Sequence, residues 1–160
     1  MTSGAPSPDD RTPRRALVRR GFLLGALAVG GVASARWFNT AARIGETGLS
    51  VQDAHTGALT GDITLIDIRR PDEWARTGVG EGAVPIDMRT PDFTNRLLAA
   101  VDGDRSAPIA LICARGVRSR VLRTRLMDAG FTRILDVPEG MLGSGAGQGW
   151  IGAGLPIRPL

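Results

Sequence analysis

A single cysteine follows an apolar run and precedes a loop that contains glycine. Residues 109–112 read Ile-Ala-Leu-Ile, Cys113 comes next, and Gly116 follows shortly before a segment with helical character. Open α/β sheets bind ligands at the carboxyl ends of their parallel strands, so a cysteine at this position is typical of a reactive thiol. The unpaired N–H groups and the positive dipole at the start of the following helix favour the thiolate, which is the nucleophilic form of sulfur.

Two arginines accompany the cysteine. Arg115 lies inside the loop and Arg118 lies at the beginning of the expected helix. Arginine binds oxyanions through paired N–H donors, so both residues are candidates for contact with an anionic substrate. The alternative for each arginine is an ordinary solvated charge, and the alternative for Cys113 is a buried, inert thiol.

The elements that must position this loop are strands alternating with helices. Continuous runs of β-branched and apolar residues predict strands that are covered on both faces. The expected strands are residues 49–51, 63–68, 83–86, 109–112 and 134–137. Helices are expected at residues 51–59, from Pro71, at residues 93–101 and at residues 116–129. This order predicts a single α/β domain with a central, mostly parallel, five-stranded sheet and helices on both faces.

The helix at residues 116–129 directly follows the cysteine loop. Its apolar side chains that we expect to face the core are Val117, Val121, Leu122 and Leu126. Gly130 is expected to end this helix, because glycine readily adopts the left-handed conformation that follows a last helical turn.

One histidine and one cysteine offer little material for a transition-metal site. His55 is predicted on the exposed face of the first helix, far along the chain from Cys113. We therefore predict no metal site and no Cys–His catalytic pair.

Four segments of the chain, taken in order, resemble the rhodanese family. Residues 65–74 resemble the first strand of the family with its following turn, and residues 78–83 resemble its glycine-rich turn. Residues 113–119, Cys-Ala-Arg-Gly-Val-Arg-Ser, resemble the active-site loop. Residues 136–141 together with 149–156 resemble the C-terminal signature. Several pieces in order make a stronger signal than any one of them.

The sequence departs from the family pattern at three positions within residues 49–157, which the resemblance covers. Val79 and Glu81 stand where the family often has His and Pro, and Glu139 replaces a glycine of the commoner Gly-Gly. The glycine-rich residues 143–148 are expected to shape the mouth of the site, so the identity of the substrate stays open.

The resemblance implies a two-step sulfur transfer. Cys113 attacks the outer sulfur of a small anionic donor such as thiosulfate, sulfite leaves, and a persulfide remains on the cysteine. A thiol or a protein acceptor then removes that sulfur. The persulfide and the donor would be held by the loop residues Ala114, Arg115, Gly116, Val117 and Arg118. The chemistry requires no metal and no organic cofactor.

Three further residues match family positions near the loop. Asp67 and Arg69 are interpreted as a strand-end acid and base that tie loops together, and Glu73 is their expected partner. We assign all three a structural role, because nothing in the sequence places Asp67 on the substrate.

Two other functions are open alternatives. Phosphatases of the dual-specificity type and arsenate reductases have a related fold and carry arginine six positions after the cysteine. Here Ser119 stands at that position and Arg118 precedes it, so the loop is shorter and suits sulfur better than phosphate. A non-catalytic sulfur carrier or binding module would also keep Cys113, and fold alone does not separate it from an enzyme.

Residues 1–36 have the organisation of an export signal. A disordered start is followed by Arg19-Arg20-Gly-Phe-Leu, which resembles a twin-arginine signal, and by a Gly/Ala-rich apolar stretch that ends in Ala-Ser-Ala. The alternative is a retained membrane anchor at residues 21–35, although a spanning helix needs about 20 apolar residues.

Either interpretation predicts a periplasmic or exported domain, or one anchored to the outer face of the cytoplasmic membrane. Residues 37–48 would be a linker and residues 49–160 the domain. The net charge of +4 belongs to residues 1–36, with six arginines and two acids, whereas the rest of the chain holds fourteen of each. Nucleic-acid-binding domains carry their own basic excess, so no nucleic-acid partner is expected.

Overall fold

The structure is a computed structural model that describes Met1 and residues 48–160. The predictions of an export signal or anchor at residues 1–36 and of a linker at residues 37–48 lie outside the described residues, apart from Met1 and Gly48. Within the described part of the chain, no helix combines the length and the apolar character that crossing a membrane demands.

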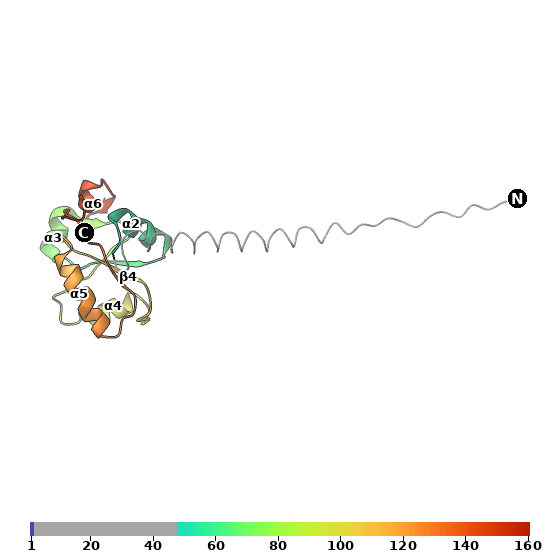
Figure 1. Cartoon of the computed structure of the whole chain (residues 1–160), viewed down its shortest axis with the longest axis horizontal. Coiled ribbons are helices and arrows are strands. Elements are labelled where there is room, and N and C mark those ends of the chain that lie inside the picture. The colour runs from blue at the N-terminus through green and yellow to red at the C-terminus, as the bar shows by residue number, and fades with distance from the viewer. Residues whose placement is uncertain (2–47) are drawn as a thin grey trace. The chain divides into compact units, whose positions relative to one another are not determined.

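Four short parallel strands form the central sheet. They are β1 (Thr64–Asp67), β3 (Val84–Pro85), β4 (Ile109–Ile112) and β5 (Ile134–Asp136). Their order is β3-β1-β4-β5, and every neighbouring pair is parallel. Asp67 at the end of β1 pairs with Ile112 at the end of β4, so the loops that follow both strands leave from one edge of the sheet (Figure 1).

The sheet has four strands where the sequence predicts five. Residues 49–51 do not form a strand; the contact there is an isolated parallel bridge between Gly48 and Asp136, with the Leu49 N–H donating to the Asp136 carbonyl at 2.8 Å. The reason is local, because Ser50 caps a helix and accepts a hydrogen bond from the Asp53 N–H at 3.1 Å. The chain therefore turns into the helix after one residue of pairing.

Five helices accompany the described strands. They are α2 (Val51–Thr60), α3 (Pro71–Thr77), α4 (Phe93–Ala99), α5 (Val117–Asp128) and α6 (Gly149–Gly152). Pro71 opens α3, and Gly130 follows α5 with a φ of +89°, as the sequence predicts. Helix α6 and a small antiparallel pair, β2 (Val79–Gly80) with β6 (Ile157–Arg158), were not foreseen.

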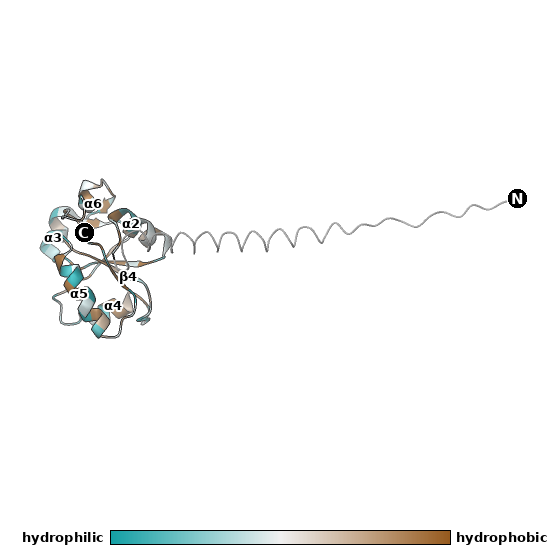
Figure 2. Ribbon diagram, in the orientation of Figure 1, coloured by the Kyte–Doolittle hydropathy of each residue, from teal (hydrophilic) through white to brown (hydrophobic). Residues whose placement is uncertain are grey.

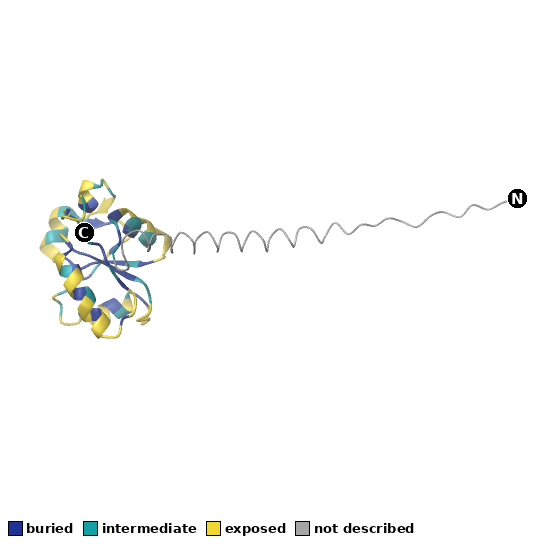
Figure 3. Ribbon diagram, viewed as in Figure 1, coloured by how far each residue is buried: buried dark blue, intermediate teal, exposed yellow. Residues whose placement is uncertain are grey.

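Two apolar clusters cover the two faces of the sheet. On one face Ile66, Ile109 and Leu111 pack with side chains of α4 and α5. On the other face Leu65, Ala110 and Ile112 pack with side chains of α2 and with Trp150 of α6. In Figure 3 the central strands are buried between these helices, and Figure 2 shows the hydrophobic residues gathered there. Helices on both faces are the layers that the sequence predicts.

The prediction for the inner face of α5 is partly wrong. Leu122 and Leu126 are buried, but Val117 and Val121 are exposed to 69% and 47%. The third inward residue is Ser119, because positions 119, 122 and 126 fall on one side of a 3.6-residue helix. Ser119 thus faces the core, whereas Val117 and Val121 belong to another side of the helix.

His55 is not the freely exposed residue that was predicted. Its ring nitrogen lies 2.8 Å from the Glu81 carboxylate, and its ring meets Trp150 edge-on with 5.3 Å between centroids. The side chain of His55 is 15% exposed, because α2 packs close to α6. His55 therefore joins these elements on the outside of the domain.

Candidate active site

Cys113 directly follows β4 and is buried, with 1% of its surface exposed. It belongs to the apolar cluster that also contains Leu122 and Leu126 of α5. The thiol therefore lies beneath the start of α5 on one face of the sheet. Cys113 is the chain's sole cysteine, so no internal disulfide can form.

The loop from Cys113 to Gly116 packs against the segment that follows β5 and is hydrogen-bonded to it. The N–H groups of Met141 and Leu142 donate to the carbonyls of Cys113 and Ala114, each at 2.9 Å. Gly116 has a φ of +78°, and an added Cβ would lie 2.2 Å from the Pro138 carbonyl oxygen. Only glycine combines that backbone conformation with so close an approach.

The backbone N–H groups of residues 114–118 donate to no acceptor among the described residues. Among the backbone hydrogen bonds of the described residues, none has a donor N–H from this range. Gly116 is the N-cap of the 12-residue helix α5, so these groups lie at the positive end of its dipole. A buried thiol therefore stands next to a run of free donors that suits an anion.

Arg118 is paired rather than free. Its two terminal nitrogens donate to the two carboxylate oxygens of Glu73 at 2.8 and 2.7 Å. The hydrogen bond from Arg118 is the main cause that lowers the pKa of Glu73 to about 2. The same pairing raises the pKa of Arg118, and proximity to Cys113 contributes to that rise. Arg118 therefore carries a positive charge close to the thiol, and Glu73 of α3 fixes the position of its guanidinium group.

Arg115 lies inside the loop that follows Cys113. It is exposed, and its Nη1 donates to the Gly143 carbonyl at 3.2 Å. Gly143 begins the glycine-rich segment that the sequence places at the mouth of the site. The structure thus brings Arg115 and this segment together, whereas Val117 extends its side chain into solvent.

Asp67 and Arg69 form a fully buried ion pair at the end of β1. The Arg69 Nε lies 3.0 Å from both Asp67 carboxylate oxygens, and its Nη2 lies 2.7 Å from one of them. The remaining donors of Arg69 bind the Thr77 hydroxyl and the Gly78 carbonyl, each at 2.7 Å. The expectation that Glu73 joins this pair is wrong, because Glu73 turns toward Arg118 instead.

Two residues near the thiol were missed at the sequence level. The Ser119 hydroxyl lies 3.5 Å from the Cys113 sulfur and donates to the Gly116 carbonyl at 3.2 Å. Asp136 at the end of β5 is 7% exposed, and burial raises its pKa. The place of Ser119 in the cysteine loop was a usable signal, but no feature of the sequence distinguished Asp136.

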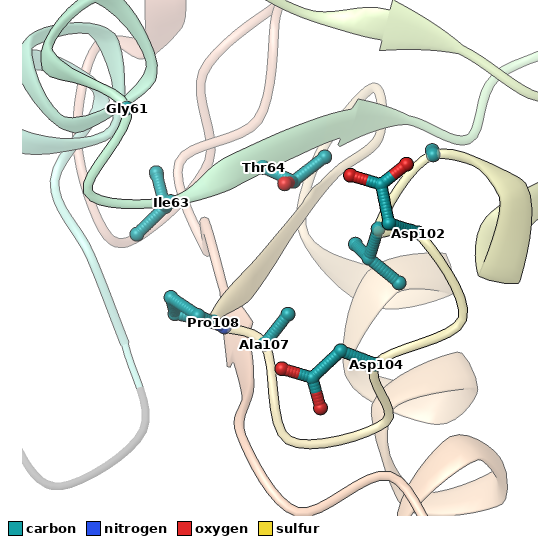
Figure 4. A pocket seen from close by; sticks show the side chains of 9 residues that line it. Gly61, Ile63, Thr64, Asp102, Asp104, Ala107 and Pro108 are labelled. Atoms are coloured by element: carbon teal, nitrogen blue, oxygen red, sulfur yellow. The ribbon is translucent and has the colours of Figure 1, made fainter.

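A pocket of about 360 Å³ lies at the opposite edge of the sheet. Its lining includes Thr64 and Pro108, at the amino ends of β1 and β4, together with Asp102 and Asp104 (Figure 4). The thiol is at the carboxyl end of β4, so this pocket is not part of the candidate site. No group of His, Cys, Asp and Glu side chains suited to a metal occurs among residues 48–160.

Comparison with known proteins identifies the family. Residues 50–143, more than half of the chain, match the sequence profile of the rhodanese-like domain. The chain belongs to the rhodanese-like domain family. A comparison with curated protein sequences found no match.

Solved structures share the fold of this rhodanese-like domain. The polysulfide-sulfur transferase homodimer of Wolinella succinogenes is 25% identical, with a TM-score of 0.55 over 82% of this chain and 90% of the other. A rhodanese-related protein of Thermoplasma volcanium is 23% identical, with a TM-score of 0.53 over 70% and 97%. A Rhodopseudomonas palustris protein of unknown function, described as a possible tyrosine phosphatase, is 21% identical, with a TM-score of 0.53 over 97% and 100%.

Proposed function

We propose that this rhodanese-like protein is a sulfurtransferase that moves sulfane sulfur through a persulfide on Cys113. The donor is a small sulfur-containing anion, such as thiosulfate or a polysulfide, and the acceptor is a thiol or a protein. The observation that carries the proposal is the placement of the chain's one cysteine beside five unpartnered N–H groups at the start of α5.

In the first step the thiolate of Cys113 attacks the outer sulfur of the donor. A sulfur–sulfur bond forms, the bond inside the donor breaks, and its electron pair leaves with the released anion. The negative charge then sits on the outer persulfide sulfur. The N–H groups of residues 114–118 are the donors available to stabilise that charge, and the positive end of the α5 dipole acts in the same direction.

In the second step an acceptor attacks the outer sulfur and regenerates the thiolate. Arg115 is the exposed cation at the mouth and is positioned to attract an anionic donor or acceptor. Arg118 acts from its pairing with Glu73, which holds its charge near the sulfur. Neither step calls for a metal or an organic cofactor.

The length of the loop favours sulfur over phosphate. Arg118 is the fifth residue after Cys113, and the next position is Ser119, whose side chain points to the thiol. A phosphoryl group needs a wider ring of donors than a single sulfur atom. We propose in addition that residues 1–36 export the protein or anchor it to the outer face of the membrane, which a fractionation of cells expressing the full chain would test.

Intact mass of the full chain, before and after incubation with thiosulfate or polysulfide, tests the proposal. We expect wild type to gain one sulfur atom, and cyanide to remove it with release of thiocyanate. Cys113→Ser should gain nothing. Absence of a mass gain with either donor would contradict the enzyme and favour a binding module. Gain of sulfur without turnover by small acceptors would assign the protein as a carrier.

A further inference from the structure

Cys113, Ser119 and Asp136 face one another behind the active-site loop. Ile134 and Asp136 are two positions apart in β5 and so share a face of the sheet. Ile134 packs in the same cluster as Cys113 and as Leu122 of α5. Asp136 is therefore directed toward the first turn of α5, where the buried Ser119 hydroxyl lies 3.5 Å from the Cys113 sulfur.

Asp136 is a buried acid without a full set of partners. Its Oδ1 has no hydrogen-bond partner among the described residues, and the residue is 7% exposed. Burial is the main cause that raises its pKa, while hydrogen bonding by Ser119 and the charges of Arg120 and Arg123 act in the opposite direction. An ionised carboxylate in this place is costly unless its charge can be shared.

Ser119 is the group that can link the acid to the thiol. Its hydroxyl has one proton and two lone pairs, so it can accept from one neighbour while it donates to another. In the structure it donates to the Gly116 carbonyl, and a rotation about its Cβ–Oγ bond redirects that proton while the oxygen stays beside the thiol. With Asp136 ionised, the thiol donates to Ser119 and Ser119 donates to the acid. With Asp136 protonated, both hydrogen bonds run the other way and end on the thiolate.

We propose that Asp136 is a positioning residue that shares one negative charge with Cys113 through the hydroxyl of Ser119. The inference rests on the proposed function in taking the Cys113 thiolate as the nucleophile. The proton of the Cys113 S–H bond passes to the Ser119 oxygen, and the Ser119 proton passes to a carboxylate oxygen of Asp136. A thiol and a carboxylate become a thiolate and a carboxylic acid, with no proton lost to solvent.

The shared charge biases the site toward its sulfur-loaded form. Two negative charges at the pair repel each other, so the pair carries one charge more readily than two. In the persulfide the charge lies one bond further out, away from Asp136 and among the free loop donors. The other charged groups facing the pair are Arg118 beside the thiol, with Glu73 bound behind it, and Arg120 and Arg123 beside the acid.

Alkylation of Cys113 by iodoacetamide between pH 4 and pH 10 tests the proposal, with the rate followed by intact mass of the full chain. The chain has one cysteine, so the signal belongs to Cys113. For wild type we expect reactivity to rise in two steps separated by a plateau. For Asp136→Asn we expect one step, with reactivity near neutral pH about tenfold above wild type. Asp128→Asn, an exposed acid at the end of α5, is the matched control.

Variants of Ser119 test the link between the acid and the thiol. They also keep the proposal testable if Asp136→Asn does not fold. Ser119→Thr keeps the hydroxyl and should retain the two-step profile. Ser119→Ala removes it and should lose the low-pH step while keeping the high-pH step. The proposal would be overturned if the pH profile of Asp136→Asn equalled that of wild type. It would also be overturned if Asp136→Asn only lowered the alkylation rate by the same factor at every pH. A profile of Ser119→Ala equal to that of wild type would do the same.

The alkylation experiment needs no sulfur donor, so its failure is distinct from failure of the proposed function. If wild type takes up no sulfur but Asp136→Asn changes the pH profile as expected, the proposal of charge sharing is supported and the proposed sulfurtransferase function is contradicted. If wild type takes up sulfur and the pH profiles of wild type and Asp136→Asn coincide, the proposal of charge sharing is contradicted and the proposed sulfurtransferase function is supported.

Discussion

Glu73 and Arg118, which are 45 residues apart, form a two-point ion pair across the candidate site, with N–O distances of 2.8 and 2.7 Å. Glu73 lies in the first turn of α3 and Arg118 in the first turn of α5. The pair joins the element after β1 to the element after β4, at the edge of the sheet where the thiol lies. It therefore fixes the start of α5 relative to the rest of the site.

Glu73→Gln should lower the free energy of unfolding by about 1–3 kcal/mol at pH 7. The pKa of Glu73 in the folded protein is about 2, below its usual 4.5. The stabilisation by the carboxylate is therefore complete above pH 4.5 and is lost as the pH falls toward 2. Urea unfolding from pH 7 to pH 3 should show the difference between variant and wild type shrinking. Asp72→Asn, an exposed acid in the same helix, should show little difference at any pH; a constant deficit for Glu73→Gln would contradict the prediction.

Arg118→Lys should reduce the rate of sulfur loading by about tenfold or more, although the charge is kept. Lysine cannot make the planar two-point contact with Glu73, so the charge near the thiol is no longer held in place. Intact-mass time courses with the donor in excess measure the rate. Arg125→Lys is the matched control, because Arg125 is an exposed residue further along the same helix. Equal rates for the two variants would argue against a role for the pairing.

Gly116→Ala should abolish sulfur loading and destabilise the domain, whereas Gly130→Ala should cost only about 1 kcal/mol. Both glycines have positive φ, +78° and +89°. An added Cβ at Gly116 would lie 2.2 Å from the Pro138 carbonyl oxygen, but at Gly130 it would meet nothing within 4 Å. Thermal unfolding and sulfur uptake of both variants separate the backbone effect from the steric one. Similar behaviour of the two variants would show that the close approach to Pro138 is unimportant.

Arg69→Met should lower the free energy of unfolding by about 3–5 kcal/mol, because it leaves Asp67 as a buried, unpaired charge. The chain offers a matched pair, since Asp87 and Arg89 repeat the same hydrogen bonds after β3. The two pairs differ in the exposure of the arginine, 1% for Arg69 and 60% for Arg89, and in the two further hydrogen bonds that Arg69 makes. Arg89→Met should cause a smaller loss, because the Asp87 side chain that it leaves unpaired is 10% exposed and within reach of water, and an equal loss in both variants would refute the argument from burial.

Much of the fold follows from local patterns that the structure confirms. The runs at residues 63–68, 109–112 and 134–137 contain the strands β1, β4 and β5, which are covered on both faces, and Pro71 and Gly130 mark helix ends. Local rules work there because burial on both faces demands continuous apolar residues, and proline and glycine act through their own backbone. The same rules did not distinguish which side of α5 is buried, because Val117 and Val121 are apolar like Leu122 and Leu126, whereas the buried Ser119 is polar.

The sequence alone determined that one cysteine lies after a buried strand and before a helix, with glycine at the turn and arginines beside it. Residue type and spacing are enough for this, because strand, loop and helix start are set by neighbours in the chain. Only the tertiary structure decided that Glu73 holds Arg118 rather than joining Arg69, and that Asp136 faces Ser119 behind the thiol. These pairings join residues 17 to 45 positions apart, and they exist because the packing of α3 and α5 on the sheet brings them into contact.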